Sequence, residues 1–425
     1  MGLLYNIGIR LYGAGIGIAA LSGHKKAKLW REGRRNIWSR IAEVKAKEEG
    51  NRATTTVWIH AASLGEFEQG RPIIEQLKQQ WPEVRIVVTF FSPSGYEVRK
   101  SYPNADHILY LPLDTPHNAR RFLDSVRPDL AIFIKYEFWL NYLSELHRRH
   151  IPTFLVSAIF RPSQIHFRPW GHIWRDALHT YSSIFVQDEA SQSLLNSIGC
   201  RNSILSGDTR FDRVATIAQA ARPIPEIEHF RGDAQLFIAG STWDKDENIL
   251  IELINRHPKT RFIIAPHEID ETRIANLERS IKAGVVRYTR YSLKSHNDTN
   301  SGSTPQVMVL DTIGLLSSAY SYARWAYIGG GFGVGIHNTL EAATFGLPIA
   351  FGPNYKKFRE ARDLITRGAA MSITNIEQLE AWFSLIVNDD EAWQKASSSA
   401  RRYTEEQCGA TATILNAITD ILPHN

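Results

Sequence analysis

The chain is poor in cysteine, with Cys200 and Cys408 alone among 425 residues. Two cysteines cannot form a disulfide framework, and without a C-x-x-C pair they provide no zinc site of that kind. The sequence also lacks the G-x-G-x-x-G fingerprint of a dinucleotide site and the G-x-x-x-x-G-K-[ST] phosphate loop. We therefore expect a protein of a reducing compartment that is neither a disulfide scaffold nor a P-loop enzyme.

The composition is that of a globular protein, with 43% hydrophobic and 22% charged residues. A chain of this length is too long for one ordinary core, so we expect two domains of about 200 residues each. The formal net charge of +5 suits nucleic acid, an anionic lipid surface or a phosphorylated substrate. The position of the charge decides among them.

Much of the positive charge follows an apolar N-terminus. Residues 1–22 are apolar apart from Arg10 and a few small polar residues. The basic residues that follow, against Glu32 alone, are Lys25, Lys26, Lys28, Arg31, Arg34, Arg35 and Arg40. This pattern fits a helix that spans the bilayer with the rest of the chain in the cytoplasm, a helix that lies in the membrane interface, or a buried helix. We expect residues 1–40 to bind an anionic membrane surface, and we expect no nucleic-acid partner.

From residue 57 onward, short apolar runs alternate with amphipathic stretches. The runs that predict strands are 57–63, 85–92, 107–114, 130–137, 153–159, 183–188, 236–241, 261–267, 284–289, 307–312, 325–331 and 347–353. This alternation predicts an α/β protein with two doubly wound, Rossmann-like domains that face a central cleft. We predict a first domain at 41–211, a linker at 212–232 and a second domain at 233–425. The second domain is expected to include a surface loop at 290–306 and one or two helices at 391–421.

Ligands of parallel sheets bind outside the carboxyl ends of the strands, so the residues after each strand are candidates. Glu66 is able to take a proton from a hydroxyl group, or simply to stabilise a helix start. Glu137, beside Trp139, suits either support of a transition state or an ion pair with Lys135 or a nearby arginine. Arg210 suits a phosphate or carboxylate ligand, or a surface salt bridge.

The second half of the chain contains a glycine-rich turn within 328–341 (IGGGFGVGIHNTLE), between a predicted strand and a predicted helix. Backbone N–H groups at such a turn suit a phosphate. Asn338 and Glu341 have the spacing of a helix-capping pair, while Glu341 is equally suited to accept hydrogen bonds from a ribose. Pro266 and His267 follow another strand and are placed to meet a base or a sugar.

Seven ordered motifs extend along nearly the whole chain. They are the apolar-basic N-terminus, H-A-A-S-L-G-E-F (60–67), Y-E-F-W (136–139), G-D-T-R-F-D (207–212), L-D-T-I-G (310–314), G-G-G with H-N-T-L-E-A-A (329–331, 337–343) and F-G-P-N-Y-K-K-F (351–358). Together they resemble the 3-deoxy-D-manno-octulosonic acid (Kdo) transferases of lipopolysaccharide assembly. The resemblance implies a glycosyltransferase-B fold, a CMP-Kdo donor, a tetra-acylated lipid A precursor (lipid IVA) as acceptor, and no required metal or other cofactor. It also implies a location at the cytoplasmic face of the inner membrane.

The resemblance also implies roles for particular residues. Glu66 matches the catalytic base, Glu137 matches a carboxylate that aids the transition state, and Arg210 stands where many members have lysine. The residues that match CMP-contacting positions are Pro266, His267, Gly314, Leu315, Leu316, Asn338, Thr339, Leu340 and Glu341. The chain departs from the family pattern at His267, which is often arginine, at Leu315, which is often acidic, and at 332–336, where many members carry arginine and glutamate.

The expected reaction is therefore transfer of Kdo from CMP-Kdo to the glucosamine primary hydroxyl of lipid IVA, with inversion of the anomeric configuration. Three alternatives remain open at this point: a glycosyltransferase of the same fold that uses a UDP- or GDP-sugar, an NAD(P)-dependent oxidoreductase, and a membrane-attached sugar-binding protein without catalytic activity. The missing dinucleotide fingerprint argues against the oxidoreductase.

Overall fold

The computed structural model describes residues 2–48, 55–291 and 305–422. The chain divides into two compact units. Unit 1 contains residues 1–213 together with 408–425, and unit 2 contains residues 214–407. Each unit has its own parallel sheet and its own core, which confirms the predicted α/β class with two Rossmann-like domains.

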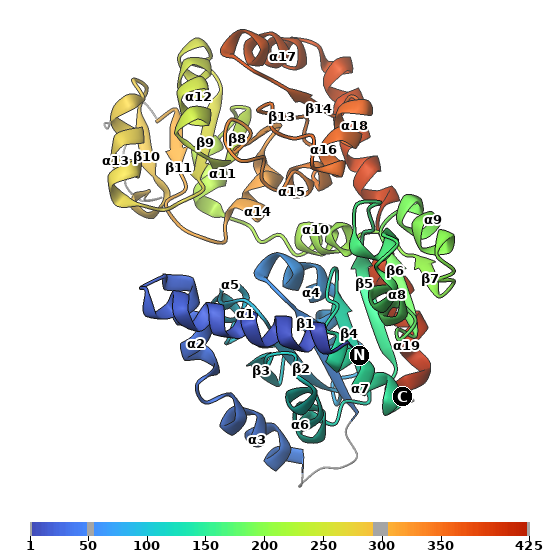
Figure 1. The fold of residues 1–425 in the computed structure, drawn as a ribbon. Coiled ribbons are helices and arrows are strands. Elements are labelled where there is room, and N and C mark those ends of the chain that lie inside the picture. Colours follow the sequence, from blue (N-terminus) through green and yellow to red (C-terminus); the bar gives the residue numbers. More distant parts are fainter. Residues whose placement is uncertain (1, 49–54, 292–304, 423–425) are drawn as a thin grey trace. The chain divides into compact units, whose positions relative to one another are not determined.

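Unit 1 is built on a seven-stranded sheet of order β3-β2-β1-β4-β5-β6-β7 (Figure 1). Its strands are β1 (Thr56–Ala61), β2 (Arg85–Phe90), β3 (His107–Tyr110), β4 (Leu130–Ile134), β5 (Thr153–Ala158), β6 (Ser183–Val186) and β7 (Ser203–Leu205). Neighbouring strands are parallel throughout, and every residue of β1, β4 and β5 is buried. Continuous Val, Ile, Leu and Phe runs are expected in such strands because both faces of the sheet are covered by helices.

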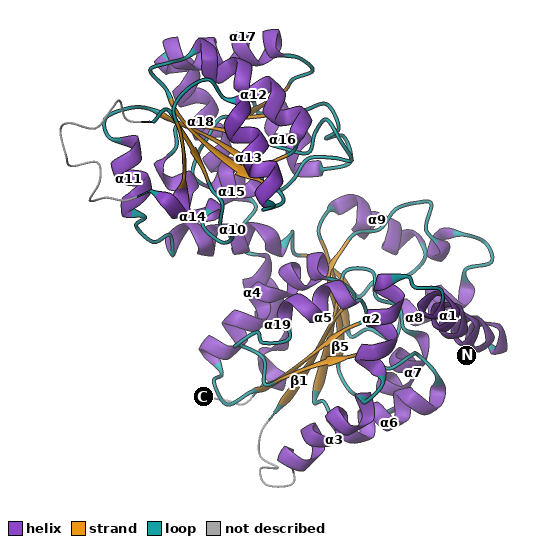
Figure 2. Ribbon diagram, turned by 90° about the vertical axis from the view of Figure 1, so that its left-hand side faces the viewer, coloured by secondary structure: helices purple, strands orange, loops and turns teal. Residues whose placement is uncertain are grey.

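Helices cover both faces of the unit 1 sheet (Figure 2). One face carries α4 (Leu64–Gln80), α5 (Pro93–Arg99) and α19 (Ala410–Ile418), and α19 packs against α4. The opposite face carries α3 (Ile37–Glu48), α6 (Pro116–Val126) and α7 (Leu140–Arg148), which pack in that order. Unit 1 also contains α8 (His172–Leu178), α9 (Glu189–Ser197) and the start of α10 (Thr209–Gln219), and α10 continues into unit 2.

The N-terminal segment forms α1 (Leu3–Leu21) and α2 (Lys25–Arg34), and α1 lies against unit 1 along one side (Figure 1). The Tyr5 hydroxyl donates a hydrogen bond to the buried Asp114 carboxylate, and the Tyr5 ring meets Trp174 edge-on at 5.9 Å. The Tyr12 ring stacks on Phe91 at 6.0 Å. No residue of α1 is buried, and its opposite side consists largely of exposed leucine and isoleucine.

Unit 2 is built on a second parallel seven-stranded sheet, of order β10-β11-β9-β8-β12-β13-β14. Its strands are β8 (Leu236–Thr242), β9 (Arg261–Pro266), β10 (Val285–Arg287), β11 (Val307–Val309), β12 (Trp325–Ile328), β13 (Ile349–Phe351) and β14 (Ala370–Ser372). Its helices are α11 (Pro225–Arg231), α12 (Asp244–Arg256), α13 (Glu271–Ser280), α14 (Leu316–Ala319), α15 (Leu340–Thr344), α16 (Arg359–Thr366), α17 (Ile376–Asn388) and α18 (Asp390–Glu406). The ring of Phe383 in α17 packs edge-on against Phe237 and Trp325 of the sheet, at 5.3 and 5.0 Å.

Two predicted boundaries are corrected. The predicted linker at 212–232 is largely helical, since it contains the end of α10 and all of α11. The predicted second domain at 233–425 loses its C-terminal end, because residues 408–425 belong to unit 1. The physical reason is the Asp212 carboxylate, which accepts hydrogen bonds from the N–H groups of Gly409 and Thr411 and from the Thr411 hydroxyl at 2.6–2.7 Å. The two predicted terminal helices are present as α18 and α19. Most of the predicted loop at 290–306 lies outside the described residues.

Candidate functional site

The order of strands in unit 1 reverses between β1 and β4, which are neighbours in the sheet although β2 and β3 lie between them in the chain. In doubly wound sheets a ligand crevice lies outside the carboxyl ends of the strands at such a switch point. The segments that follow these two strands are 62–66 and 135–139. They carry Glu66 and Glu137, so the strand order brings together two of the predicted site residues.

Glu66 lies in the first turn of α4 and is partly buried. The Ser63 hydroxyl donates a hydrogen bond to Glu66 Oε2 at 2.8 Å. Burial raises the pKa of Glu66, and the nearby negative charge of Glu137 raises it further, while the Ser63 hydrogen bond and the positive charge of Lys135 lower it by less. A raised pKa brings a carboxylate closer to the range in which a general base is most effective at neutral pH.

Glu137 is buried beyond the end of β4, so the predicted strand 130–137 is three residues too long. The chain turns at Lys135, whose φ of 72° lies in the left-handed region that residues other than glycine rarely adopt. The Glu137 carboxylate accepts a hydrogen bond from the Trp139 indole N–H and lies 3.1 Å from His60 Nε2. The Tyr181 hydroxyl holds the Glu137 carbonyl at 2.6 Å. Glu137 is therefore held by His60 and Tyr181, which are distant from it in the sequence, and by the nearby Trp139.

The orientation of His60 follows from its other contacts. The Trp58 indole N–H donates to Thr89 Oγ1 at 2.8 Å, and Thr89 Oγ1 forms a second hydrogen bond with His60 Nδ1, also at 2.8 Å. His60 Nε2 lies 3.1 Å from the Glu137 carboxylate and 2.9 Å from the Trp139 indole nitrogen, which donates to it. Sequence reasoning assigned no role to His60. One feature of the sequence could have revealed His60: it is a histidine inside a strand whose other residues are apolar or threonine. A histidine in such a strand is fully buried and therefore requires hydrogen-bond partners.

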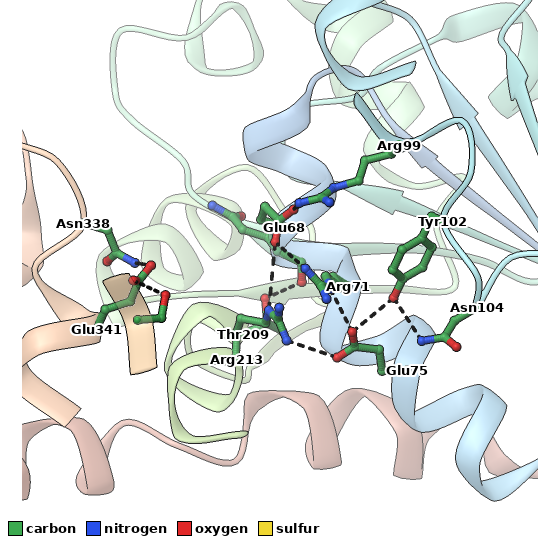
Figure 3. A network of polar contacts seen from close by, with 12 residues as sticks. Glu68, Arg71, Glu75, Arg99, Tyr102, Asn104, Thr209, Arg213, Asn338 and Glu341 are labelled. Atoms are coloured by element: carbon green, nitrogen blue, oxygen red, sulfur yellow. Dashed lines mark hydrogen bonds and ion pairs between the residues drawn. The ribbon is translucent and has the colours of Figure 1, made fainter. Parts of the chain in front are cut away.

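Arg210 lies at the start of α10, where the Thr209 hydroxyl donates to the Gln69 carbonyl of α4 at 2.6 Å. Its guanidinium forms an ion pair with Asp208 at 2.7 Å, and about a third of the side chain is exposed. The predicted alternative of a salt bridge is thus present. Beside Gln69, Glu68 and Glu75 of α4 form an ion-pair network with Arg71, Arg99 and Arg213 (Figure 3). This network fixes the first turns of α4, which include Glu66.

In unit 2 the strand order reverses between β8 and β12. Asp246, in the first turn of α12, is fully buried at this point. Its carboxylate accepts hydrogen bonds from the Tyr327 hydroxyl at 2.8 Å, the Gly330 N–H at 2.9 Å and the Trp243 N–H at 2.9 Å. A single carboxylate thereby joins the segment after β8 to the glycine-rich turn after β12.

The glycine-rich turn is packed tightly, and this differs from the predicted phosphate cradle. A Cβ atom on Gly329 would lie 2.2 Å from the Ser241 carbonyl oxygen, and one on Gly331 would lie 2.6 Å from the Gly352 backbone. The N–H groups of Gly329, Gly330, Gly333 and Gly335 all donate to protein acceptors. These glycines therefore allow close backbone packing, and those four donors are engaged within unit 2.

Three rings gather from the segments that follow β8, β9 and β12. The rings of His267 and His337 stack with centroids 4.2 Å apart, and Trp243 lies 4.8 Å from His267. The Trp243 indole N–H donates to His337 Nε2 at 3.1 Å. Burial lowers the pKa of His337, and the neighbouring His267 lowers it further. Trp243 and His337 were missed as site residues, although Trp243 directly follows a strand.

The other predicted nucleotide-contacting stretches lie close to one another. Gly314 has a φ of +94°, a backbone conformation that favours glycine, and Leu315 and Leu316 then begin α14. The Ser317 hydroxyl donates to Glu341 Oε2 at 2.6 Å. The Asn338 side chain donates to Glu341 Oε1 at 2.9 Å and accepts the Leu340 N–H at 3.1 Å (Figure 3). The predicted capping pair is not formed, because the N-cap residue of α15 is Thr339 and it makes no side-chain capping bond; Asn338 and Glu341 contact each other through their side chains. Thr339 and Leu340 are fully buried.

Within the described part of the chain, no group of three His, Cys, Asp or Glu side chains is arranged to hold a metal ion. The expectation that the protein requires no metal stays a prediction.

The comparisons with known proteins agree with the motifs. A sequence profile described as "3-Deoxy-D-manno-octulosonic-acid transferase (kdotransferase)" matches residues 35–213. The "3-deoxy-D-manno-octulosonic acid transferase" of Haemophilus influenzae is 26% identical, covering 87% of this chain and 88% of that protein. The enzyme of the same name from Bordetella pertussis is 27% identical, covering 93% and 95%.

Solved structures support the fold. The UDP-GlcNAc 2-epimerase of Neisseria meningitidis, bound to UDP-GlcNAc, superposes with a TM-score of 0.61 at 14% identity, over 86% of this chain and all of that one. A putative UDP-N-acetylglucosamine 2-epimerase from Listeria monocytogenes gives 0.58 at 13% identity, over 87% of this chain and 96% of that one. At these identities the likeness shows the shared two-domain, glycosyltransferase-B type of fold.

Proposed function

We propose, from the premise that this chain is a glycosyltransferase homologous to the Kdo transferases, that it moves Kdo from CMP-Kdo to the glucosamine primary hydroxyl of lipid IVA. The observation that carries the proposal is the pair of carboxylates at the switch point of unit 1, Glu66 partly buried in a first helical turn and Glu137 held by His60 and Trp139. The pair lies inside the region that the Kdo transferase profile matches.

In the proposed reaction Glu66 removes the proton from the acceptor hydroxyl. The hydroxyl oxygen forms a bond to the anomeric carbon of Kdo, while the bond from that carbon to the CMP phosphate oxygen breaks and CMP leaves with the electron pair. Attack from the face opposite the leaving group inverts the configuration. Glu137 stabilises the positive charge that develops on the sugar.

We assign Arg210 to the departing phosphate, in exchange for its contact with Asp208. The backbone donors of the glycine-rich turn are a weaker choice for this role than the sequence suggested, since four of them donate to protein acceptors.

We propose that CMP binds unit 2 at Pro266–His267, Gly314–Leu316 and Asn338–Glu341. The stacking of His267 on His337 and the hydrogen bond from Ser317 to Glu341 support a single site for these three stretches.

We propose that the protein is held at the cytoplasmic face of the inner membrane by α1 and α2. The outward apolar residues of α1 are Leu3, Leu4, Ile7, Leu11, Ile18 and Leu21. Within the described residues α1 is the one helix long and apolar enough to cross a membrane. Its contacts through Tyr5 and Tyr12 to unit 1 favour a helix that lies in the interface, with the basic residues of α2 beside anionic headgroups.

The double substitution Leu4→Glu and Leu11→Glu should release the protein from anionic vesicles without altering its affinity for CMP. Both leucines are exposed, at 83% and 66%, so the substitutions leave the contacts of α1 with unit 1 in place. Vesicle sedimentation and CMP titration measure the two quantities. Leu385→Glu, at an exposed leucine of α17, is the control and should sediment like the wild type. Unchanged sedimentation of the double variant would remove α1 from the proposed role.

The pH dependence of transfer should reflect the raised pKa of Glu66. The base must be deprotonated, so the rate falls as the pH decreases through a value above the roughly 4.3 of an ordinary glutamate. Glu137→Gln removes a charge that raises this pKa, so the acidic limb of its normalised profile should move to lower pH. Ser63→Ala removes a hydrogen bond that lowers it, so that limb should move to higher pH. If the acidic limbs of both variants moved in the same direction, Glu66 would not be the group whose pKa sets the pH dependence.

The direct test of the reaction is incubation with a CMP-Kdo generating system and lipid IVA, followed by mass spectrometry of the lipid. The proposal expects a mass increase of one or more Kdo residues. A thermal-shift panel separates the alternatives, because a ligand that binds the folded state raises the melting temperature. CMP should stabilise the protein, whereas stabilisation by UDP, GDP or NADH in place of CMP would overturn the donor assignment.

A further inference from the structure

Unit 1 contains a cavity that the proposed reaction has not used. It has a volume of about 330 Å³ and lies between α1, α2 and the segment that joins β2 to α5. Most of its wall is apolar and includes Tyr12, Ile16, Ala19, Trp30 and Phe91. Its volume falls within the range of small-molecule sites, at the lower end.

The aromatic wall of the cavity is fixed from behind. Phe91 stacks with Tyr12 at 6.0 Å and meets Trp30 edge-on at 5.9 Å. The half-buried Arg34 lies with its guanidinium 3.9 Å from the centre of the Trp30 ring, and donates to the Phe91 carbonyl at 2.8 Å. The aromatic wall of the cavity is therefore held in place by contacts within unit 1.

The same cavity has basic residues beside its apolar wall. His24 and Lys26 line it, and the neighbouring Lys25 and Lys28 are exposed. An apolar wall with cations beside it is complementary to an amphiphile that has a hydrocarbon chain and a negatively charged headgroup. A nucleotide sugar offers an apolar wall only its base, and an uncharged hydrocarbon has no group that matches the lysines.

The cavity adjoins the candidate catalytic residues through two contacts. The Ser92 N–H, in the lining segment, donates at 2.7 Å to the Ala62 carbonyl, in the loop just before the helix that carries Glu66. On its other side the Phe91 ring lies 4.6 Å from Trp139, whose indole N–H donates to Glu137. The cavity wall thus adjoins both segments that carry the proposed catalytic carboxylates.

We propose that this cavity binds one acyl chain of the lipid acceptor, with Lys26 and His24 beside the acceptor's negatively charged headgroup. This inference rests on the proposed function, because it takes the acceptor to be a phosphorylated, acylated saccharide. The cavity is separate from the outward apolar side of α1, which faces away from unit 1 and which we assign to the membrane. The site therefore distinguishes an acylated acceptor from a deacylated one.

Filling the cavity tests the proposal. Ala19→Trp places an indole in it, and the exclusion of about four methylene groups corresponds to a roughly 10²-fold loss of affinity. The KM for tetra-acylated lipid IVA should therefore rise by about that factor. The kcat/KM for the fully deacylated, bisphosphorylated disaccharide should stay that of the wild type. Ala42→Trp makes the same change at an exposed position of α3 and should alter neither value. An unchanged KM for lipid IVA, or equal losses with both acceptors, would overturn the proposal.

A second measurement uses the wild-type protein and needs no turnover. Lipid IVA that carries a diazirine on one acyl chain is photolysed with the protein, and the labelled peptides are sequenced by mass spectrometry. We expect labels at Tyr12, Trp30 and Phe91 that unlabelled lipid IVA removes and an excess of phosphatidylglycerol does not. Labels confined to the outward side of α1, or removed equally by phosphatidylglycerol, would refute an acceptor site here. If the wild type transfers no Kdo, the proposed function is wrong. The labelling experiment then tests by itself whether the cavity binds an acyl chain of lipid IVA.

Discussion

Replacing Glu66 with glutamine should reduce the rate of Kdo transfer by roughly 10²–10⁴-fold, the usual loss when a general base is removed. Glutamine has nearly the same shape, and its amide oxygen is able to accept the Ser63 hydroxyl as Glu66 does. The first turn of α4 therefore keeps its structure. The variant loses the ability to accept a proton at the pH where the wild type works.

The measurement is the initial rate of product formation with saturating CMP-Kdo and lipid IVA. Glu83→Gln, at an exposed glutamate before β2, is the matched control and should retain wild-type turnover. Since CMP is assigned to unit 2, the thermal stabilisation by CMP should be the same in Glu66→Gln and in the wild type. Wild-type turnover by Glu66→Gln would exclude Glu66 as the base, whatever the position of Glu137.

Replacing Asp246 with alanine should destabilise unit 2 by about 3–5 kcal/mol, which is exceptional for a single substitution. Three donors, from Tyr327, Gly330 and Trp243, lose their acceptor in a fully buried position. Each unsatisfied buried donor costs roughly 1–3 kcal/mol. The substitution also removes a buried charge whose desolvation opposes folding. We therefore expect the total loss for the three donors to lie near the lower end of their summed costs.

Urea denaturation followed by circular dichroism measures this loss as a lower midpoint for one of two transitions, because each unit has its own core. Asp244→Ala is the matched control: it lies two residues away in the same helical turn, and its carboxylate is 83% exposed in its contact with Arg273. An exposed ion pair of this kind contributes about 0–1 kcal/mol. Equal midpoints for the two variants would show that Asp246 does not hold the glycine-rich turn in place.

The sequence predicted most strands because a buried parallel strand is a continuous apolar run, and such runs are visible without any tertiary information. Two strands were missed, β7 and β14, and both lie at an edge of their sheet. Each has three residues, and each contains polar or exposed positions. An edge strand has one neighbour and partial cover, so its residues need not be apolar, and their pattern resembles that of a loop.

The sequence by itself determined the fold class, the number of sheets and the resemblance to the Kdo transferases, because apolar periodicity and ordered motifs are properties of short stretches. Only the tertiary structure decided which stretches meet. It placed β1 beside β4, so that Glu66 lies close enough to Glu137 for the charge of one to raise the pKa of the other. It directed the donors of the glycine-rich turn inward, and it joined the last helix to unit 1 through Asp212. The physical reason is that periodicity encodes which side of an element is buried, whereas the identity of its neighbour depends on contacts between residues far apart in the chain.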